Sequence, residues 1–223
     1  DFFELRAVLE ELVTAGTETC TIDVGDMEQD RVEGFVKAGF SYIRTSFPMG
    51  AYAIEDITYE LGSNNGRPAV AISIQYRRSR TEIRRIRHKR DMEALADAVR
   101  EALDDHSSRV VFLVEQYSEM DFEQVVQDYA RKEPRMLMEV PQISEGIYGA
   151  GESRIVELSF TYQNSREALR QMQQQVRPVF EAASLYVSGE GSDHQKFSQL
   201  SGFLAERFDY KLETSITPAY SLL

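Results

Sequence analysis

The chain carries the stretch PAVAISIQYRRSRTEIR at residues 68–84, and a related stretch, RIVELSFTYQNSREALR, follows at residues 154–170. In both, polar and apolar residues alternate up to a tyrosine, and a serine suited to cap a helix comes next. One shift of 86 residues, without a gap, aligns Pro48 with Pro134, Ile57 with Ile143, Val70 with Val156, Ser73 with Ser159, Tyr76 with Tyr162, Ser79 with Ser165, Arg80 with Arg166, Ile83 with Leu169 and Arg84 with Arg170. The sequence therefore predicts a duplicated unit.

The elements of the first unit are predicted from the residues around its first copy of this stretch. A turn at 62–66, rich in Gly and Asn, predicts a hairpin between strands at 57–61 and 68–76. Upstream, residues 1–15 predict a helix, residues 19–24 predict a strand, and Asp26 with Gln29 resembles a capping box for a helix ending before Pro48. Ser79 with Glu82 is a full capping box, and the apolar stripe from Ile83 to residue 103 predicts one helix after it.

The second unit repeats this order. A strand at 110–115, a helix capped within 118–121 and reaching Lys132, a break at Pro134, a hairpin of strands 143–148 and 154–162, and a helix from Ser165 are expected. We therefore expect an α+β fold of two tandem βαββα repeats packed together, with mixed or antiparallel sheets and helices on one face, followed by a short helical segment. The expected divisions are 1–16 (lead-in helix), 17–105 (first repeat), 106–187 (second repeat) and 188–223 (linker and further helix).

Composition excludes several classes of protein. The chain has 223 residues, of which 42% are hydrophobic and 28% charged, so most of it has enough apolar surface to fold. A net charge of −12 argues against a general nucleic-acid binder. No apolar run is long enough to cross a bilayer, and a single Cys forms no intramolecular disulfide.

Residue types that often carry chemistry occur here without informative spacing. Cys20 lies in an alternating strand, so a buried small side chain is expected there instead of a nucleophile. His88, His106 and His194 show no metal-ligand spacing, and we expect them to be solvated. The acids at 23–30 lack the glycine and the final glutamate of a calcium loop, and the glycine loops at 62–66 and 149–151 join strands. No catalytic residue, metal ligand or cofactor is expected.

One feature that composition does not explain is a basic segment with eight cationic side chains: Arg77, Arg78, Arg80, Arg84, Arg85, Arg87, Lys89 and Arg90. The 86-residue shift places Gln163, Asn164, Arg166, Arg170, Gln171, Gln173, Gln175 and Val176 opposite them, so the fold is expected to need polarity there and not charge. Two interpretations follow. The segment is either a solvated helix face offset by acids at 93–105, or a docking patch for an anionic wall polymer, lipid surface or acidic domain.

The end of the chain resembles a known family. Asp193-His194-Gln195-Lys196, a hydrophobic helix, Phe208-Asp209-Tyr210 and residues 219–223 resemble the start of the transglutaminase-like core of bacterial papain-type cysteine enzymes. Many bacterial members also carry strand-helix-hairpin-helix units upstream, with a proline after the first helix, as at Pro48 and Pro134. In that family a Gly-rich turn with the nucleophilic Cys follows, and later a His and an Asp, so none of the catalytic residues falls on this sequence.

The resemblance implies a non-catalytic N-terminal region of an exported bacterial protein, extracellular or at the cell surface. This region would present or shield a downstream cysteine-enzyme core, and the full-length protein would be a transferase or peptidase if that core is active. Expected partners are that core and a protein or peptidoglycan-peptide substrate, with no nucleic acid and with a membrane only through an anchor elsewhere. The alternative is a stand-alone binding module that takes an anionic cell-envelope component on a basic helix spanning Arg77 to Arg90.

Overall fold

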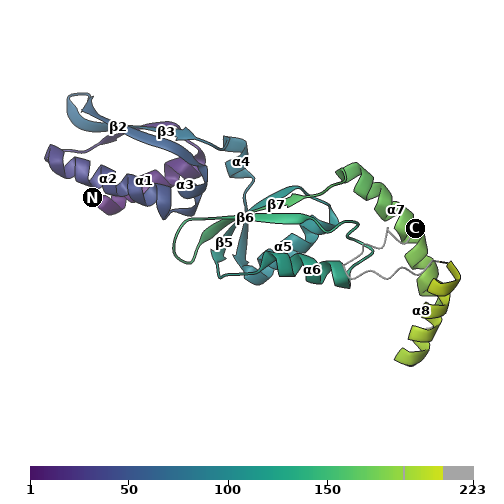
Figure 1. Ribbon diagram of the computed structural model, residues 1–223. Helices are drawn as coiled ribbons and strands as arrows, with labels where there is room; N and C mark the ends of the chain where they lie inside the picture. The colour runs from purple at the N-terminus through teal and green to yellow at the C-terminus, as the bar shows by residue number, and fades with distance from the viewer. Residues whose placement is uncertain (188, 208–223) are drawn as a thin grey trace. The chain divides into compact units, whose positions relative to one another are not determined.

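The computed structural model describes residues 1–187 and 189–207, and its helices and strands are shown in Figure 1. Helices and strands mix along the chain, which confirms the expected α+β class. The described residues divide into two compact units, one of residues 1–95, 111–119 and 145–158, the other of residues 96–110, 120–144, 159–187 and 189–207. These units do not coincide with the expected repeats at 17–105 and 106–187, because residues 111–119 and 145–158 group with the first unit.

A three-stranded antiparallel sheet lies in the first unit. Its order is β1 (Thr19–Asp23), β3 (Arg67–Tyr76), β2 (Ile54–Asn64). Val70, Ile72 and Ile74 of β3 are buried while their neighbours are exposed, as the alternation predicts. Asn65 and Gly66 both have positive φ, 51° and 79°, which suits the tight turn of the predicted hairpin.

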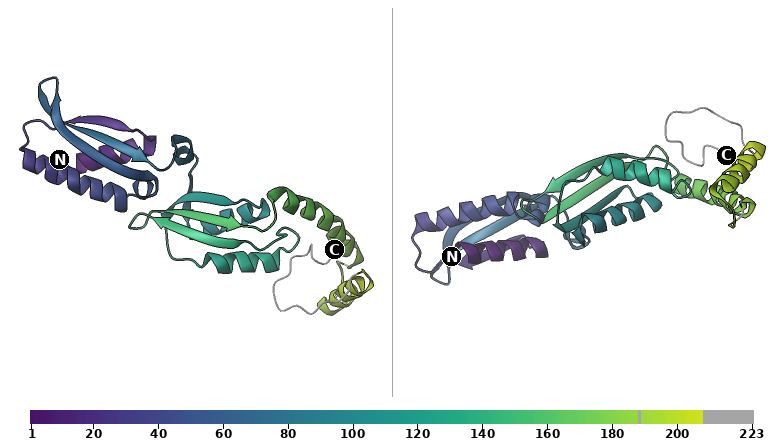
Figure 2. Two further views of the ribbon diagram at one scale, coloured as in Figure 1. Left: turned by 45° about the horizontal axis from the view of Figure 1, so that its top comes forward. Right: turned by 90° about the horizontal axis from the view of Figure 1, so that it is seen from below.

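Three helices cover one face of this sheet: α1 (Phe2–Ala15), α2 (Gln29–Thr45) and α3 (Pro48–Ala53). Figure 2 shows the same arrangement from two further directions. Leu9 and Val13 of α1 and Val36 and Ile43 of α2 are buried in the core that they share with the sheet. The expected capping box of Asp26 is wrong: α2 begins at Gln29, and its N-cap makes no side-chain hydrogen bond.

The single helix expected from Ile83 to residue 103 is also wrong. The capping box of Ser79 and Glu82 is present, but helix α4 covers only Arg80–Arg84. The chain then forms strand β4 (Arg87–Asp91) and a new helix, α5 (Met92–Asp104). Ile83 and Ile86 are both buried in the core of the first unit, where the short helix ends. Asp91 caps the next helix, because its carboxylate accepts a hydrogen bond from the amide of Ala94 at 3.0 Å.

A second sheet has the order β4, β5 (Arg109–Gln116), β7 (Arg154–Thr161), β6 (Gln142–Tyr148). β4 pairs with β5 in parallel. Helices α6 (Phe122–Lys132) and α7 (Arg166–Tyr186) follow the predicted positions, with Asp121 and Ser165 as their N-caps. The predicted strands at 110–115, 143–148 and 154–162 are therefore confirmed to within a few residues.

The two sheets share a local order, β1-β3-β2 in one and β5-β7-β6 in the other. The amides of Ile74 and Phe160 each donate to the carbonyl of the residue just before the first strand of these sets. A helix precedes each set: α1 ends at Gly16, with φ 67°, and α5 is followed by His106, with φ 48°. These features agree with the expected duplication, which stays a prediction and in which α5 would be the counterpart of α1.

Helix α8 (Asp193–Arg207) is the further helix expected after the second unit. Ser192 caps it, since its hydroxyl accepts from the amide of Gln195 at 3.3 Å. The segments 208–210 and 219–223, on which the family resemblance partly depends, lie outside the described residues. Within 1–187 and 189–207, no helix is both long and apolar enough to cross a membrane.

Candidate binding site

The basic segment from Arg77 to Arg90 does not form one helix face. It runs from the end of β3 through α4 and a turn into β4. The comparison with residues 163–176 therefore fails beyond Arg84, because that stretch of the second unit continues as helix α7 while residues 87–91 form a strand. The eight cations divide into side chains that bind the protein itself and side chains that face outward.

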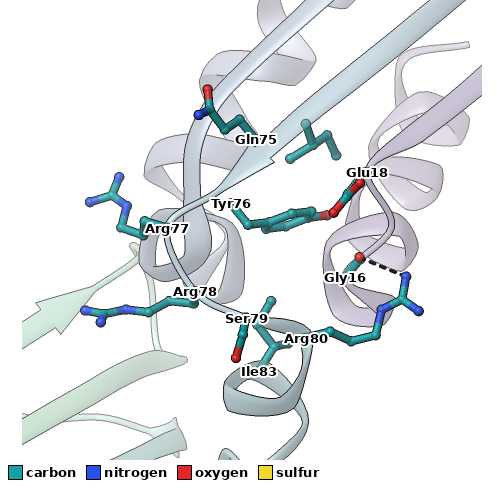
Figure 3. Close-up of a pocket in the computed structure, with 10 residues that line it drawn as sticks. Gly16, Glu18, Gln75, Tyr76, Arg77, Arg78, Ser79, Arg80 and Ile83 are labelled. Atoms are coloured by element: carbon teal, nitrogen blue, oxygen red, sulfur yellow. Dashed lines mark hydrogen bonds between the residues drawn. The ribbon is translucent and has the colours of Figure 1, made fainter.

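Arg77 and Arg78 are used inside the first unit. The guanidinium of Arg77 donates through Nε and Nη2 to the carbonyl of Ile54, at 3.1 and 2.5 Å. Nη2 of Arg78 lies 3.5 Å from the carboxylate of Glu157, and its guanidinium carbon lies 4.9 Å from the centre of the Tyr52 ring. Both arginines point away from the neighbouring pocket in Figure 3. These two arginines therefore connect the end of β3 to residues of β2, α3 and β7.

This pocket, of about 520 Å³, lies where the end of α1, the start of β1 and the end of β3 meet α4. It is lined by Gly16, Glu18, Ile74, Gln75, Tyr76, Arg77, Arg78, Ser79, Arg80 and Ile83. The Tyr76 hydroxyl donates to the carbonyl of Thr17 at 2.7 Å, and burial, then the Glu18 carboxylate, raises the pKa of Tyr76 to about 12. Arg80 donates to the carbonyl of Gly16 at 3.3 Å. The Glu18 carboxylate opposes an anion here, so we do not place the anion site in this pocket.

The other five cations form what we call the outer cationic segment: Arg84, Arg85, Arg87, Lys89 and Arg90. All except Lys89 are exposed, and Lys89 is half-buried. Among the described residues, Arg84 and Arg85 have no ion-pair partner, and Arg90 pairs with the adjacent Asp91 at 3.1 Å. The segment thus presents more positive charge than its own neighbours neutralise.

Arg87 and Lys89 contact one aromatic ring. The guanidinium carbon of Arg87 lies 5.2 Å and the ammonium nitrogen of Lys89 lies 5.7 Å from the centre of the Phe112 ring. Phe112 is fully buried in β5. The stems of these two cations are therefore held against the sheet by cation–π contact while their charge remains available.

The acids expected to offset the segment are largely engaged elsewhere. Asp97 pairs with Arg100 at 2.6 Å, and Asp105 pairs with Arg166 and with Arg170. Asp104 accepts a hydrogen bond from the hydroxyl of Tyr129. These contacts weaken the interpretation of the basic segment as one half of a self-neutralised helix.

The remaining candidates from the sequence stay apart from one another. Cys20 lies half-buried in β1, opposite Ile72, instead of deep in the core. His88 is exposed on β4 and His194 is exposed at the start of α8. No group of three His, Cys, Asp or Glu side chains within 1–187 and 189–207 is arranged to hold a metal ion. The acids at 23–30 include Asp23, whose carboxylate accepts from the amide of Gly25 at 3.0 Å.

The expectation that His106 is solvated is wrong. It is 2% exposed, and its Nε2 accepts from the amide of Met138 at 3.4 Å. Its ring packs edge-to-face on Tyr162 with the centroids 5.5 Å apart, and burial lowers the pKa of the imidazole. The burial of His106 could have been predicted from its position after α5, which corresponds to the position of Gly16 after α1. That correspondence can be seen only once α5 is recognised as a separate helix.

Comparisons with protein-family models, with curated proteins and with solved structures found no match for this chain.

Proposed function

We propose that this chain is a non-catalytic binding region that takes an acidic partner on its outer cationic segment. The observation that carries the proposal is the placement of Arg84, Arg85, Arg87 and Arg90. They are exposed at the end of α4 and along an edge strand, with Asp91 as their only ion-pair partner among the described residues. The net charge of the chain is −12, so this segment is a local reversal of sign. Such a reversal attracts anions to one place on the surface.

Protection of the sheet edge is the simpler explanation for charges on β4, because charged edge strands resist pairing with other chains. Edge protection does not explain two features of the segment. Arg84 and Arg85 precede the strand, so they add charge where there is no edge to protect. Arg87 and Lys89 rest on the Phe112 ring, which fixes their position at a cost in side-chain freedom that edge protection does not require.

The proposal does not depend on the resemblance to transglutaminase-like proteins. That resemblance, with the downstream core as a partner and the exported location, stays a prediction. Binding and positioning are also the roles that it implies for such a region, so the two lines of reasoning are compatible. A preparation of this chain that hydrolyses or transamidates peptides unaided would contradict the non-catalytic part of the proposal.

The test is a titration of the full chain with fluorescent poly-L-glutamate at roughly 0.02 and 0.2 M salt, where the screening length changes several-fold. We expect binding that weakens with salt. The variant Arg84→Gln/Arg85→Gln/Arg87→Gln/Arg90→Gln should bind at least about tenfold more weakly, a loss of about 1.4 kcal/mol.

A control for the pair variant Arg84→Gln/Arg85→Gln, which should also bind more weakly, is available on helix α6, where Arg131 and Lys132 are exposed. The variant Arg131→Gln/Lys132→Gln removes positive charge away from the outer cationic segment and should bind like the unaltered chain. Equal losses in both variants, or binding that ignores salt, would contradict the proposal.

A further inference from the structure

We infer that the acidic partner is an extended polypeptide that adds to the free edge of β4 as a further strand of the second sheet. This inference rests on the proposed function and names the partner of the same segment. It joins three observations: the position of β4 in the sheet, the distribution of cations over both of its faces, and the acidic residue at one end of it.

β4 is a terminal strand. The order β4-β5-β7-β6 gives it a single neighbour, β5, and the parallel pairing runs from Arg87 opposite Phe112 to Asp91 opposite Gln116. Within the part of the chain that the structure describes, residues 87–91 make no backbone hydrogen bonds to any other strand or loop. One side of the strand therefore offers amide and carbonyl groups to an incoming strand.

The cations lie on both faces of the strand. Arg87 and Lys89 share the face of the Phe112 ring. Successive side chains of a strand point to opposite faces, so His88 and Arg90 lie on the other face. An incoming strand that carries Asp or Glu at neighbouring positions would place a carboxylate beside a cation on each face, which is the cross-strand pairing that stabilises sheets.

This distribution favours a polypeptide over a flat anionic surface. A lipid surface can meet one face of a strand at a time, so it would contact either Arg87 and Lys89 or Arg90, but not all three. A peptide backbone, in contrast, matches the exposed amide and carbonyl groups and brings side chains to both faces at once. An acidic extended peptide therefore fits both the positive charges of β4 and its unpaired backbone groups.

The charge along β4 also indicates which part of the partner is acidic. Arg84, Arg85 and Arg87 lie at or before the start of the strand, whereas Asp91 closes it and is already bound to Arg90 and to the amide of Ala94. The acidic residues of the partner should therefore lie beside the Arg87 end, with neutral residues beside Asp91.

The experiment uses the full chain and a fluorescent peptide of about ten residues, in which pairs of consecutive Glu or Asp residues stand among Val and Thr, so that carboxylates lie on both faces of the strand. Its matched twin has the same sequence and charge but carries N-methyl groups on two consecutive central amides, which blocks backbone pairing on both edges of the peptide. We expect the parent peptide to bind and the twin to bind at least about tenfold more weakly. Of two further peptides, one with all acidic residues at its N-terminal end and one with all of them at its C-terminal end, the peptide that places them beside Asp91 should bind more weakly than the other.

The outcomes separate this inference from the proposed function. If the twin binds within about twofold of the parent, strand addition is wrong, although acidic binding stands. If neither the peptide nor poly-L-glutamate binds, the proposed function fails first. Tighter binding to vesicles of anionic lipid than to the peptide, or dimers of the chain that the Arg87→Gln/Arg90→Gln variant abolishes, would show another occupant and overturn the inference.

Discussion

Arg87 of β4 faces Phe112 of β5 in the parallel pair, and its guanidinium carbon lies 5.2 Å from the centre of the buried ring. The cation therefore both packs on the sheet and faces solvent. Removing its charge should affect stability slightly and binding strongly. That separation makes the outer cationic segment testable without unfolding the protein.

Arg87→Gln should lower the free energy of unfolding by about 0.5–1 kcal/mol, since an exposed cation–π contact contributes about that much. Urea titration of the variant beside Arg84→Gln measures it. Arg84 is exposed and without an ion-pair partner among the described residues, so its variant should remain within about 0.5 kcal/mol of the original chain. Equal losses would mean that the ring contact contributes nothing.

Arg78 should behave as a structural residue although it belongs to the same basic run. Its side chain is 26% exposed, and that of its partner Glu157 is 16% exposed. Arg78→Ala removes this ion pair and the contact with Tyr52, so we expect a loss of about 1–3 kcal/mol in the free energy of unfolding. Poly-L-glutamate binding by the folded variant should change little. A loss of binding without a loss of stability would instead place Arg78 among the cations that bind the partner.

His106 makes stability depend on pH. Burial, the largest cause, lowers the pKa of its imidazole below the usual value of about 6.5; Asp105 and Glu139 oppose this shift, and Arg166 and Arg170 add to it. The folded protein therefore keeps the ring neutral where the unfolded chain already binds a proton. The contribution is present above pH about 6.5 and is lost as the pH falls toward the folded pKa. Urea titrations between pH about 7.5 and 5.5 should show that loss.

Other groups titrate in the same range, so a variant must isolate the histidine. His106→Asn keeps a residue that tolerates the positive φ of 48° and removes the titrating ring. The difference in unfolding free energy between the original chain and this variant should shrink as the pH falls below about 6.5. A difference that stays constant across the range would show that the ring does not titrate with folding.

Gly16 ends α1 in a left-handed conformation, with φ 67°, and an added Cβ there would lie 3.3 Å from Cγ of Arg80. Gly16→Ala should therefore reduce the free energy of unfolding by about 1–2 kcal/mol. Gly62, in β2, has no positive φ and open space around it, so Gly62→Ala should cause no loss. Chemical denaturation of the two variants compares the sites directly. Similar results for both would contradict the strained conformation at Gly16.

Local patterns in the sequence predicted most of the elements. The alternation in 68–76 and 154–162 gave β3 and β7, and the serines at 79 and 165 cap helices as expected. These signals act over a few residues, so they do not depend on the rest of the fold. The start of α2 is an exception: Asp26 was expected to cap it, but the helix begins at Gln29 and its N-cap, Glu28, makes no side-chain hydrogen bond.

Strand β4 could not be predicted in the same way. Residues 87–91 read Arg-His-Lys-Arg-Asp, without apolar alternation, and the strand forms by pairing with β5 more than twenty residues later in the chain. The predicted helix from Ile83 to residue 103 included these residues because Ile86 and Leu95 also fit the spacing of a helix. The capping position of Asp91, three residues before Ala94, was the one local signal of a new helix.

The basic segment from Arg77 to Arg90 was visible as a run of cations in the sequence, but its division into inward and outward side chains was not. Which arginines bind Ile54 or Glu157 and which face outward depends on contacts between elements distant in sequence. The burial of His106 likewise follows from its packing against Tyr162 and Met138. Such contacts arise from tertiary structure, so a single sequence does not carry them.

Strand addition to β4 is tested most directly by hydrogen exchange of the full chain with and without the acidic peptide. We expect slower exchange of amides within 84–91, with the other described strands unchanged, and no such slowing in the variant Arg84→Gln/Arg85→Gln/Arg87→Gln/Arg90→Gln. Slower exchange around the pocket at Tyr76, or none in 84–91 at peptide concentrations that saturate binding, would contradict it.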